Sequence, residues 1–461
     1  MAEVPDLSTP RRVHVVAAGG AGMSAIATVL VEAGHTVSGS DAVDGAALRR
    51  LEARGVQVRV GHDADAVAGA DLVLVSTAVA ADNPEVVAAR AAGIPVLSRR
   101  DLLPALAVRQ PFLSVAGTHG KTTTSSMLAV ALDRAGLQPS FLVGAEVAAL
   151  GAAAGFRPGA YLVLEADESD ATFLAGPRAG ALVTNLEPDH LEFWGGWDAL
   201  EAGFVEFLAG TDGPRVVCAD DPGSAALAAL AGVPVTTYGT DPSADHRLVD
   251  VDLGPVGSSF RLEGPAGGVE VRLAVPGLHN ALNAAGALAL AVELGVDPGT
   301  VAAGLGAHTG VARRFEHRGE RDGITFVDDY AHLPTEVRAA LAAGRSGGWG
   351  RVVAVFQPHR YSRTALLGTE FGPCFDDADV VVLTELYAAG EDPRPGVDGR
   401  LVHDAVVAAS PGLDVRWAAT LDDVADLLAA ELRPGDLCLT VGAGDVTQVA
   451  DMVQSRLGGA A

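Results

Sequence analysis

The stretch that decides the fold of this chain is LSVAGTHGKTTT, residues 113–124. It predicts an apolar strand, a turn between two glycines, and a helix that continues through residues 127–132. Such a turn binds phosphate, because its backbone N–H groups and the helix dipole both face an anion. Lys121 and Thr122 then stand where the β- and γ-phosphates of a nucleotide and its Mg²⁺ would be held. The loop is a G-x-x-G-K-T, shorter than the general motif, which has four residues between its glycines.

Lys121 is the only lysine of the chain, so 31 of the 32 basic residues are arginine. A sequence that uses arginine at every other cationic position, but lysine here, indicates a need for a compact point charge. A coding bias with one surviving lysine is the alternative explanation. We favour nucleotide-phosphate binding, because the lysine, the glycine turn and the helix start coincide.

Length and composition predict a soluble protein of several domains. A chain of 461 residues suggests three domains at about 150 residues each, and 49% hydrophobic residues suffice for their cores. The formal net charge of −26 argues against a nucleic-acid partner, which needs a basic surface. The three cysteines lack paired spacing, residues 1–10 lack a signal peptide's apolar core, and no apolar run could span a membrane. We therefore expect a cytoplasmic protein without membrane insertion.

The N-terminal segment predicts a βαβ unit. A strand at 13–16 is followed by glycines within 19–22, a helix over 23–33 and a strand at 36–38. Asp41 follows about 20 residues after the glycines, as in dinucleotide-binding folds. Ala17 stands at the first glycine position of that motif, so NAD binding, and with it a dehydrogenase, stays an open alternative at this point.

Two buried strands in the middle of the chain end in polar residues. The strand at 161–164 leads into Glu165, and the strand at 181–184 leads toward His190. Ligands of open α/β sheets bind at the carboxyl ends of strands, so these side chains are candidate ligands of Mg²⁺ or water. A helix-capping acid and a surface histidine are the alternative. An irregular β segment is expected over 240–275, before a helix whose His279, Asn280 and Asn283 either cap it or line a base pocket.

The C-terminal third predicts another parallel sheet with polar strand ends. Strands are expected at 324–327, 352–356, 380–383 and 437–441. His332 follows the first, and His359, Arg360 and Arg363 follow the second. Two histidines and two arginines at adjacent strand ends would hold a carboxylate or phosphate through paired hydrogen bonds. A surface salt-bridge cluster is the alternative.

Taken together, these motifs resemble those of one family, the Mur ligases. The matching stretches are GGAGMS at 19–24, GTHGKTTT at 117–124, EADESD at 165–170, TN at 184–185, DH at 189–190, HN at 279–280 with Asn283, RRF at 313–315, DDYAH at 328–332 and QPHRYSR at 357–363. They follow one another over nearly the whole chain, which makes the resemblance far more specific than any single motif.

The resemblance implies an α/β protein of three domains: an N-terminal Rossmann-like domain for a UDP-sugar (1–109), a central P-loop ATPase-type mixed sheet (110–312), and a C-terminal Rossmann-like domain for the amino acid (313–461). By resemblance, the UDP-sugar is bound by Gly19, Gly20, Ala21, Gly22, Met23, Ser24 and Asp41. ATP is bound by Gly117, Thr118, His119, Gly120, Lys121, Thr122, Thr123, His279, Asn280, Asn283 and Arg314. The metal is held by Thr122, Glu165 and His190, and the carboxylate and amino-acid pocket is formed by Tyr330, His332, His359, Arg360 and Arg363.

The implied reaction joins L-alanine to the carboxylate of UDP-N-acetylmuramate, with ATP and Mg²⁺, or Mn²⁺, in peptidoglycan precursor synthesis. The carboxylate first takes the γ-phosphate of ATP to give an acyl phosphate, and the amine then displaces phosphate. Lys121, Glu165, His332 and Arg363 are the expected catalytic residues. The alternatives are a ligase that recycles murein peptides and a nucleotide-binding relative that has lost ligation. Leu333 stands where the family often has a second histidine, and we expect a monomer or homodimer.

Overall fold

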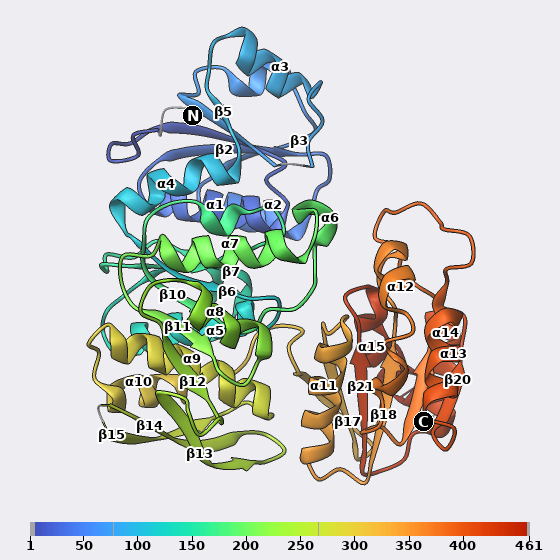
Figure 1. Cartoon of the computed structure of the whole chain (residues 1–461). Coiled ribbons are helices and arrows are strands. Elements are labelled where there is room, and N and C mark those ends of the chain that lie inside the picture. Colours follow the sequence, from blue (N-terminus) through green and yellow to red (C-terminus); the bar gives the residue numbers. More distant parts are fainter. Residues whose placement is uncertain (1–4, 77, 266, 459–461) are drawn as a thin grey trace. The chain divides into compact units, whose positions relative to one another are not determined.

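The computed structural model describes residues 5–76, 78–265 and 267–458, and they form three β-sheets flanked by helices (Figure 1). The chain divides into two compact units. The first contains the chain through Asp250 together with residues 260–272 and 282–308, and the second contains residues 251–259, 273–281 and the chain from Thr309 onward.

The first sheet is a parallel Rossmann-like sheet with strand order β3-β2-β1-β4-β5. Its strands are β1 (Arg12–Val16), β2 (Thr36–Asp41), β3 (Gln57–Val60), β4 (Leu72–Val75) and β5 (Val96–Leu97). Its helices are α1 (Ala21–Glu32), α2 (Ala46–Ala53), the 3₁₀ helix η1 (Ala64–Val67), α3 (Pro84–Ala91) and α4 (Arg99–Arg109). Order and direction agree with the βαβ unit predicted from the sequence.

The second sheet has ten strands in the order β15-β14-β13-β12-β11-β10-β6-β9-β7-β8. The strands are β6 (Phe112–Ala116), β7 (Ser140–Val147), β8 (Ala152–Gly155), β9 (Leu162–Glu165), β10 (Arg178–Val183), β11 (Arg215–Cys218), β12 (Thr236–Gly239), β13 (His246–Leu253), β14 (Ser258–Gly264) and β15 (Gly267–Leu273). The helices are α5 (Lys121–Arg134), η2 (Thr172–Leu174), α6 (Leu191–Trp194), α7 (Trp197–Ala209), α8 (Pro222–Leu230), α9 (Leu278–Glu293) and α10 (Pro298–Leu305). The sheet is mixed, because β7 and β8 are antiparallel while the strands around β6 are parallel.

The third sheet has six strands in the order β16-β17-β21-β18-β19-β20. The strands are β16 (Glu316–Arg321), β17 (Ile324–Asp329), β18 (Arg351–Phe356), β19 (Val380–Leu383), β20 (Asp414–Trp417) and β21 (Asp436–Val441). The helices are α11 (Pro334–Ser346), α12 (Tyr361–Leu367), η3 (Gly372–Cys374), α13 (Gly399–Ala409), α14 (Leu421–Glu431), η4 (Asp445–Gln448) and α15 (Val449–Gly458). Only β16 runs antiparallel to its neighbour.

The first two sheets share a hydrophobic core, because helix α1 packs on strands β7 and β8 as well as on its own sheet. Val15 and Leu30 of the N-terminal part belong to the same buried cluster as Phe112 and Leu164 of the central part. The third sheet has its own two cores, one on each face. The N-terminal and central parts are thus built as one body.

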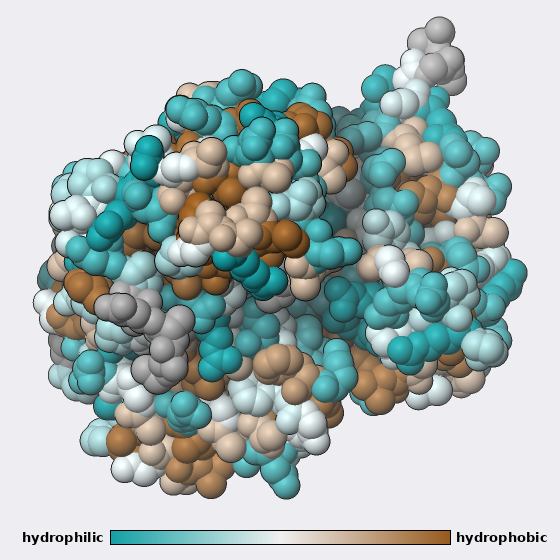
Figure 2. Space-filling model, turned by 90° about the horizontal axis from the view of Figure 1, so that it is seen from above, coloured by the Kyte–Doolittle hydropathy of each residue, from teal (hydrophilic) through white to brown (hydrophobic). Residues whose placement is uncertain are grey.

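The face seen in Figure 2 carries hydrophilic residues with small hydrophobic patches between them. Within the described part of the chain, no helix is both long and apolar enough to cross a membrane.

Candidate active site

The glycine loop after β1 is closed by a carboxylate from the end of β2. The backbone N–H of Gly19 donates to Oδ2 of Asp41 at 2.8 Å, and the N–H of Val43 donates to its other oxygen. A Cβ on Gly19 would lie 2.7 Å from that carboxylate, so a larger residue there would displace the Asp41 side chain. Ala17, which replaces the first glycine of the motif, adopts the left-handed conformation with φ 58°. The turn predicted from the glycines is therefore present, with a strained alanine at its start.

The phosphate loop between β6 and α5 also depends on two glycines. Gly117 has φ 131°, and a Cβ there would lie 2.2 Å from the hydroxyl of Thr184. Gly120 has φ 76°, and a Cβ there would lie 2.7 Å from the amide oxygen of Asn283. Asn283, on helix α9, thus lies against the loop that precedes Lys121. Both glycines are required for backbone conformation and for space.

Lys121 is the first residue of α5, and its side chain is almost wholly buried. Its ammonium donates to the carbonyl of Gly117 at 2.7 Å and to that of Thr118 at 3.1 Å, and it pairs with the Glu168 carboxylate at 2.9 Å. Burial alone would lower the pKa of Lys121, but the carboxylates of Glu168 and Asp167 outweigh burial and raise it. Lys121 therefore stays positively charged at neutral pH.

Thr122 and Glu165 meet beside the phosphate loop. The Thr122 hydroxyl donates to Oε1 of Glu165 at 2.9 Å, and the N–H of Gly144 donates to Oε2 at 2.5 Å. The contact follows from strand order, because β9, which ends in Glu165, pairs directly with β6, which leads into the loop. Hydroxyl and carboxylate oxygens are the donors that Mg²⁺ prefers.

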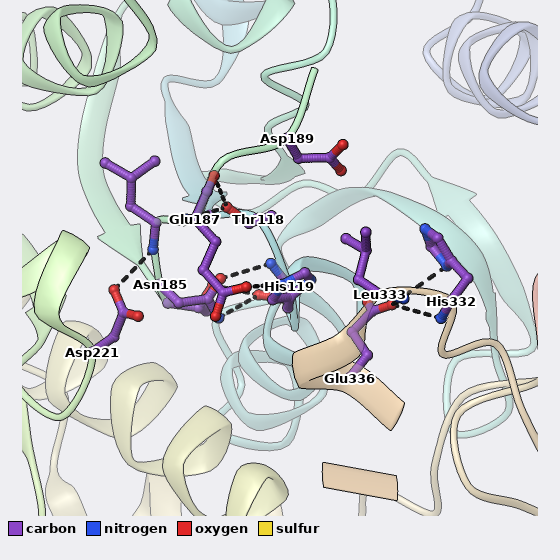
Figure 3. Close-up of polar contacts among 12 residues, drawn as sticks. Thr118, His119, Asn185, Glu187, Asp189, Asp221, His332, Leu333 and Glu336 are labelled. Carbon is purple, nitrogen blue, oxygen red and sulfur yellow. Dashed lines mark hydrogen bonds and ion pairs between the residues drawn. The ribbon is translucent and has the colours of Figure 1, made fainter. Parts of the chain in front are cut away.

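The chain after β10 supports the loop from the other side (Figure 3). The amide oxygen of Asn185 accepts from the N–H of His119 at 2.7 Å, and Nε2 of His119 lies 3.1 Å from Oε2 of Glu187. The N–H of Glu187 donates to the Thr118 hydroxyl at 2.8 Å. His119 and Thr118 thus fix the loop on the β10 side.

His190 lies in the same segment and in a left-handed conformation, φ 53°, with Nε2 3.4 Å from Oδ2 of Asp189. Among the described residues, no group of three or more His, Cys, Asp or Glu side chains is arranged as a metal site. Mg²⁺ commonly keeps several waters and takes only one or two carboxylates from the protein. The pair of Thr122 and Glu165 fits that kind of site.

The predicted base-pocket residues at the start of α9 differ in their contacts. The Asn280 side chain donates to the carbonyl of Pro276 at 2.7 Å, which is a local contact of the turn before the helix. Burial, and then the charge of Arg314, lowers the pKa of His279 to about 4. His279 is therefore neutral at physiological pH.

In the second unit, the segments after β17 and β18 bring four of the predicted carboxylate-pocket residues together. The ring of His332 lies 5.4 Å from that of Tyr330 and 5.9 Å from that of His359. Nδ1 of His359 lies 3.1 Å from a guanidinium nitrogen of Arg363. Burial, and then the neighbouring His332, lowers the pKa of His359 to about 4. Arg360 opens helix α12 with φ 70°.

One expectation about this cluster is corrected. The strands that precede His332 and His359 are not adjacent, because β21 lies between β17 and β18. The segments beyond the strand ends, rather than the strands themselves, bring the two rings together. Chain order does not reveal that the last strand inserts into the middle of a sheet.

The two arginines before β16 have different surroundings. Nε of Arg313 lies 3.0 Å from the buried carboxylate of Asp328, and the Arg313 guanidinium also donates to the carbonyl of Gly442. The Arg314 guanidinium lies 3.9 Å from a carboxylate oxygen of Glu336 and over the Tyr330 ring, 5.1 Å from its centroid. Arg313 is thus held by close contacts to Asp328 and Gly442, whereas Arg314 faces Glu336 and Tyr330.

Sequence reasoning assigned no role to several residues that organise the site. Glu168 pairs with Lys121, and Glu336 accepts the backbone N–H of His332 at 2.9 Å (Figure 3). Tyr387 stacks on His359, with ring centroids 5.8 Å apart and planes at 7°. The spacing of four residues between His332 and Glu336 at a helix start is a signal for that contact. Nothing in the sequence indicates the contact of Tyr387.

The site combines a charged lysine on a phosphate loop, a hydroxyl–carboxylate pair beside it and a Rossmann-like glycine loop. This combination is typical of a nucleotide-dependent enzyme. Three family models match the chain in order: "Mur ligase family, catalytic domain" over residues 12–110, "Mur ligase middle domain" over 115–291 and "Mur ligase, glutamate ligase domain" over 313–444. The chain belongs to the Mur ligase family.

Two alanine ligases and a murein peptide ligase are similar to this chain over nearly its whole length. The chain is 50% identical to a UDP-N-acetylmuramate–L-alanine ligase of Kineococcus radiotolerans, over 97% of this chain and 96% of the relative. A solved UDP-N-acetylmuramate-alanine ligase from Thermotoga maritima is 28% identical, with a TM-score of 0.81 over 98% of this chain and 100% of that one. A solved murein peptide ligase from Psychrobacter arcticus is 23% identical, with a TM-score of 0.68 over 98% and 99% of the two chains, and shows a shared fold alone.

Proposed function

We propose that this protein is an ATP-dependent ligase that joins L-alanine to the carboxylate of UDP-N-acetylmuramate through an acyl phosphate, in peptidoglycan precursor synthesis. The observation that carries the proposal is the environment of Lys121. The chain's only lysine is buried, kept charged by Glu168 and Asp167, and located at the start of the helix that follows the phosphate loop. Full-length similarity to alanine ligases supports the choice of substrates.

Each part of the chain has a proposed role. Residues 1–109 bind the UDP-sugar, with the diphosphate on the loop from Gly19 to Ser24, which Asp41 holds closed. Residues 110–312 bind ATP, and residues 313–461 bind the amino acid. We do not propose NAD chemistry, because the glycine motif at residues 19–22 lies within the match to the Mur ligase family model over residues 12–110.

The first chemical step needs charge neutralisation more than covalent chemistry, because phosphoryl transfer depends on positioning and electrostatics. Lys121 supplies a fixed positive charge, and the backbone N–H groups in the first turn of α5, residues 121–123, would face the phosphates. Thr122 and Glu165, with His190, would hold Mg²⁺, which when bound neutralises phosphate oxygens. Arg314 would contact the γ-phosphate, while His279, Asn280 and Asn283 would face the adenine.

The second step needs a bound amine and a stabilised oxyanion. Arg360 and Arg363 would bind the amino-acid carboxylate, since a guanidinium forms paired hydrogen bonds with it. His332 and Arg363 would stabilise the negative oxygen that develops when the amine attacks. His332 is held by Glu336 and by the carbonyl of Tyr330, which fixes its ring for that role.

An amine panel tests the substrate assignment. The protein is incubated with ATP, Mg²⁺, UDP-N-acetylmuramate and one amine. The amines are L-alanine, glycine, L-serine, D-alanine and a murein tripeptide, and mass spectrometry identifies each product. We expect amide product with L-alanine, less with glycine, and none with the tripeptide. Preference for the tripeptide would replace our proposal with the recycling reaction, and no amide with any amine would indicate a non-catalytic relative.

ATP as a substrate and three buried free cysteines are consistent with a cytoplasmic location, which we propose for the enzyme.

A further inference from the structure

A pocket of ≈ 220 Å³ lies within the first unit, between the N-terminal and central sheets. One wall contains Gly22, in the first turn of α1, and Arg99, the first residue of α4. The other wall contains Gly144 of β7, Glu165 at the end of β9 and Asp167 just after that strand. The pocket therefore connects the glycine loop with the carboxylate that contacts Thr122. A UDP-sugar whose carboxylate reacts at the phosphate loop has to occupy this space.

Arg99 stands out because it is the one basic residue among those that line the pocket, where its charge helps to lower the pKa of Asp167. Its side chain is partly buried, and among the described residues it makes no hydrogen bond or ion pair. The helix start that carries it is fixed by a reciprocal capping box between Ser98 and Asp101. A guanidinium nitrogen of Arg99 lies 3.5 Å from the position that a Cβ on Gly22 would take. Arg99 is thus a pre-positioned cation at the glycine-loop end of the pocket.

The charges of the two walls indicate which anionic group Arg99 faces. Glu165 and Asp167 also line the pocket, where an anion needs a metal ion, Lys121 or Arg99 to offset repulsion. Arg99 lies beside Gly22 and is therefore the cation next to the glycine loop. The guanidinium fork matches two phosphate oxygens, and it keeps this geometry without deprotonation.

We propose that Arg99 is a positioning residue that binds the diphosphate of the UDP-sugar and so sets how far its carboxylate reaches toward the phosphate loop. This inference rests on the proposed function, because it assumes that a UDP-sugar occupies the pocket. Arg99 acts on substrate binding and takes no part in proton or phosphoryl transfer.

The test compares Arg99→Gln with Arg100→Gln. Arg100 is the next residue of the same helix, is exposed, and has no role in the pocket, so it controls for loss of one positive charge. Calorimetry measures the affinity of each variant for UDP-N-acetylmuramate, for UDP and for ATP. We expect Arg99→Gln to weaken UDP-N-acetylmuramate and UDP alike by about 10- to 100-fold, the usual loss for a hydrogen bond to a charged group. ATP affinity should stay close to the parent, kcat should fall because the carboxylate is no longer held at the right distance, and Arg99→Lys should recover part of the affinity.

Several outcomes would overturn the proposal. Unchanged affinity in Arg99→Gln would exclude a diphosphate contact. A loss for UDP-N-acetylmuramate without a loss for UDP would place the guanidinium on the sugar's carboxylate instead. An equal loss in Arg100→Gln would indicate a general charge effect, and a parallel loss of ATP affinity would indicate a structural role. Failure of the proposed function itself is distinguishable, because the parent protein would then bind no UDP-N-acetylmuramate and form no amide.

Discussion

At the scale of single residues, Lys121 is the side chain on which the account depends most. We expect Lys121→Ala to lower turnover at least ~10²-fold, the usual cost of losing one preorganised charge contact. UDP-N-acetylmuramate affinity should stay nearly intact, because the glycine loop after β1 does not involve Lys121. Steady-state kinetics and calorimetry measure the two quantities. Loss of UDP-sugar binding would contradict this division between the two loops.

The Ala variant needs a control for stability, because it leaves the buried Glu168 carboxylate without its partner. Lys121→Arg keeps a positive charge next to Glu168 and should fold like the parent. Its planar guanidinium cannot reproduce the compact ammonium, so its turnover should also fall. If Lys121→Arg is fully active, a point charge is not what the loop requires.

Ala17 replaces the first glycine of the glycine motif, and its left-handed backbone should lower the free energy of unfolding. An L-residue in the left-handed conformation costs about 1–2 kcal/mol, whereas glycine loses about 0.5–1 kcal/mol in backbone entropy. Ala17→Gly should therefore raise the free energy of unfolding by about 0.5–1 kcal/mol in urea denaturation. Ala18→Gly is the matched control, since Ala18 is buried without positive φ and should become less stable. Equal effects of both changes would show that strain at Ala17 is absent.

Arg363 is expected to determine amino-acid use. L-alanine has only a methyl side chain, so its carboxylate must supply most of the binding free energy, and lysine cannot form the paired hydrogen bonds of arginine. Arg363→Lys should raise the KM for L-alanine by about 10- to 100-fold and leave the KM for ATP little changed. Arg345→Lys, far along helix α11 and paired with Asp379, serves as the control. If the KM for ATP rises while the KM for L-alanine stays unchanged, the amine pocket lies elsewhere.

At the scale of elements, the parallel sheets and the phosphate loop were predictable from local sequence. Short apolar runs bounded by glycines and polar residues predicted β6, β9 and β10, and the lysine marked the start of α5. The neighbours of each strand were not predictable, because sheet order depends on packing between distant segments. Glu165 meets Thr122 since β9 pairs with β6, while β21 separates β17 from β18. Contacts such as that of Tyr387 with His359 come from segments after strands and have no local signal.

Helix α5 is also held by a buried histidine whose protonation should weaken the fold. Nε2 of His308 lies 2.8 Å from the Ser126 hydroxyl, and burial lowers the pKa of His308 to about 4. The unfolded chain takes up a proton near pH 6.5 and the folded protein only near pH 4, so the stabilisation is complete above pH 6.5 and is lost as pH falls toward 4. At pH 5 the loss should be about 2 kcal/mol from this residue.

The measurement is urea unfolding at pH 7.5 and 5.0. The decrease in the free energy of unfolding between these pH values should be smaller in His308→Gln than in the parent. His317→Gln, at an exposed position of β16, should keep the parent's decrease. If His308→Gln and the parent lose the same amount, another group is responsible for acid sensitivity.

At the scale of the whole molecule, the chain has a glycine loop on the first sheet, a phosphate loop on the second and a cluster of histidines and arginines on the third. The number of sheets followed from length and from three groups of strand patterns. The packing of α1 on both of the first two sheets could not be read from the sequence, because α1 is apolar almost all round and gives no clear face. This packing creates the pocket that links the two loops.

The central claim is that the UDP-sugar carboxylate is activated as an acyl phosphate before the amine attacks. The most direct test uses UDP-N-acetylmuramate labelled with ¹⁸O in its carboxylate, with ATP, Mg²⁺ and L-alanine, and mass spectrometry of the inorganic phosphate. A carboxylate oxygen that attacks the γ-phosphorus leaves with phosphate when the amine forms the amide bond. The account predicts one ¹⁸O per phosphate released, in step with ADP and amide, whereas unlabelled phosphate beside labelled amide would contradict it.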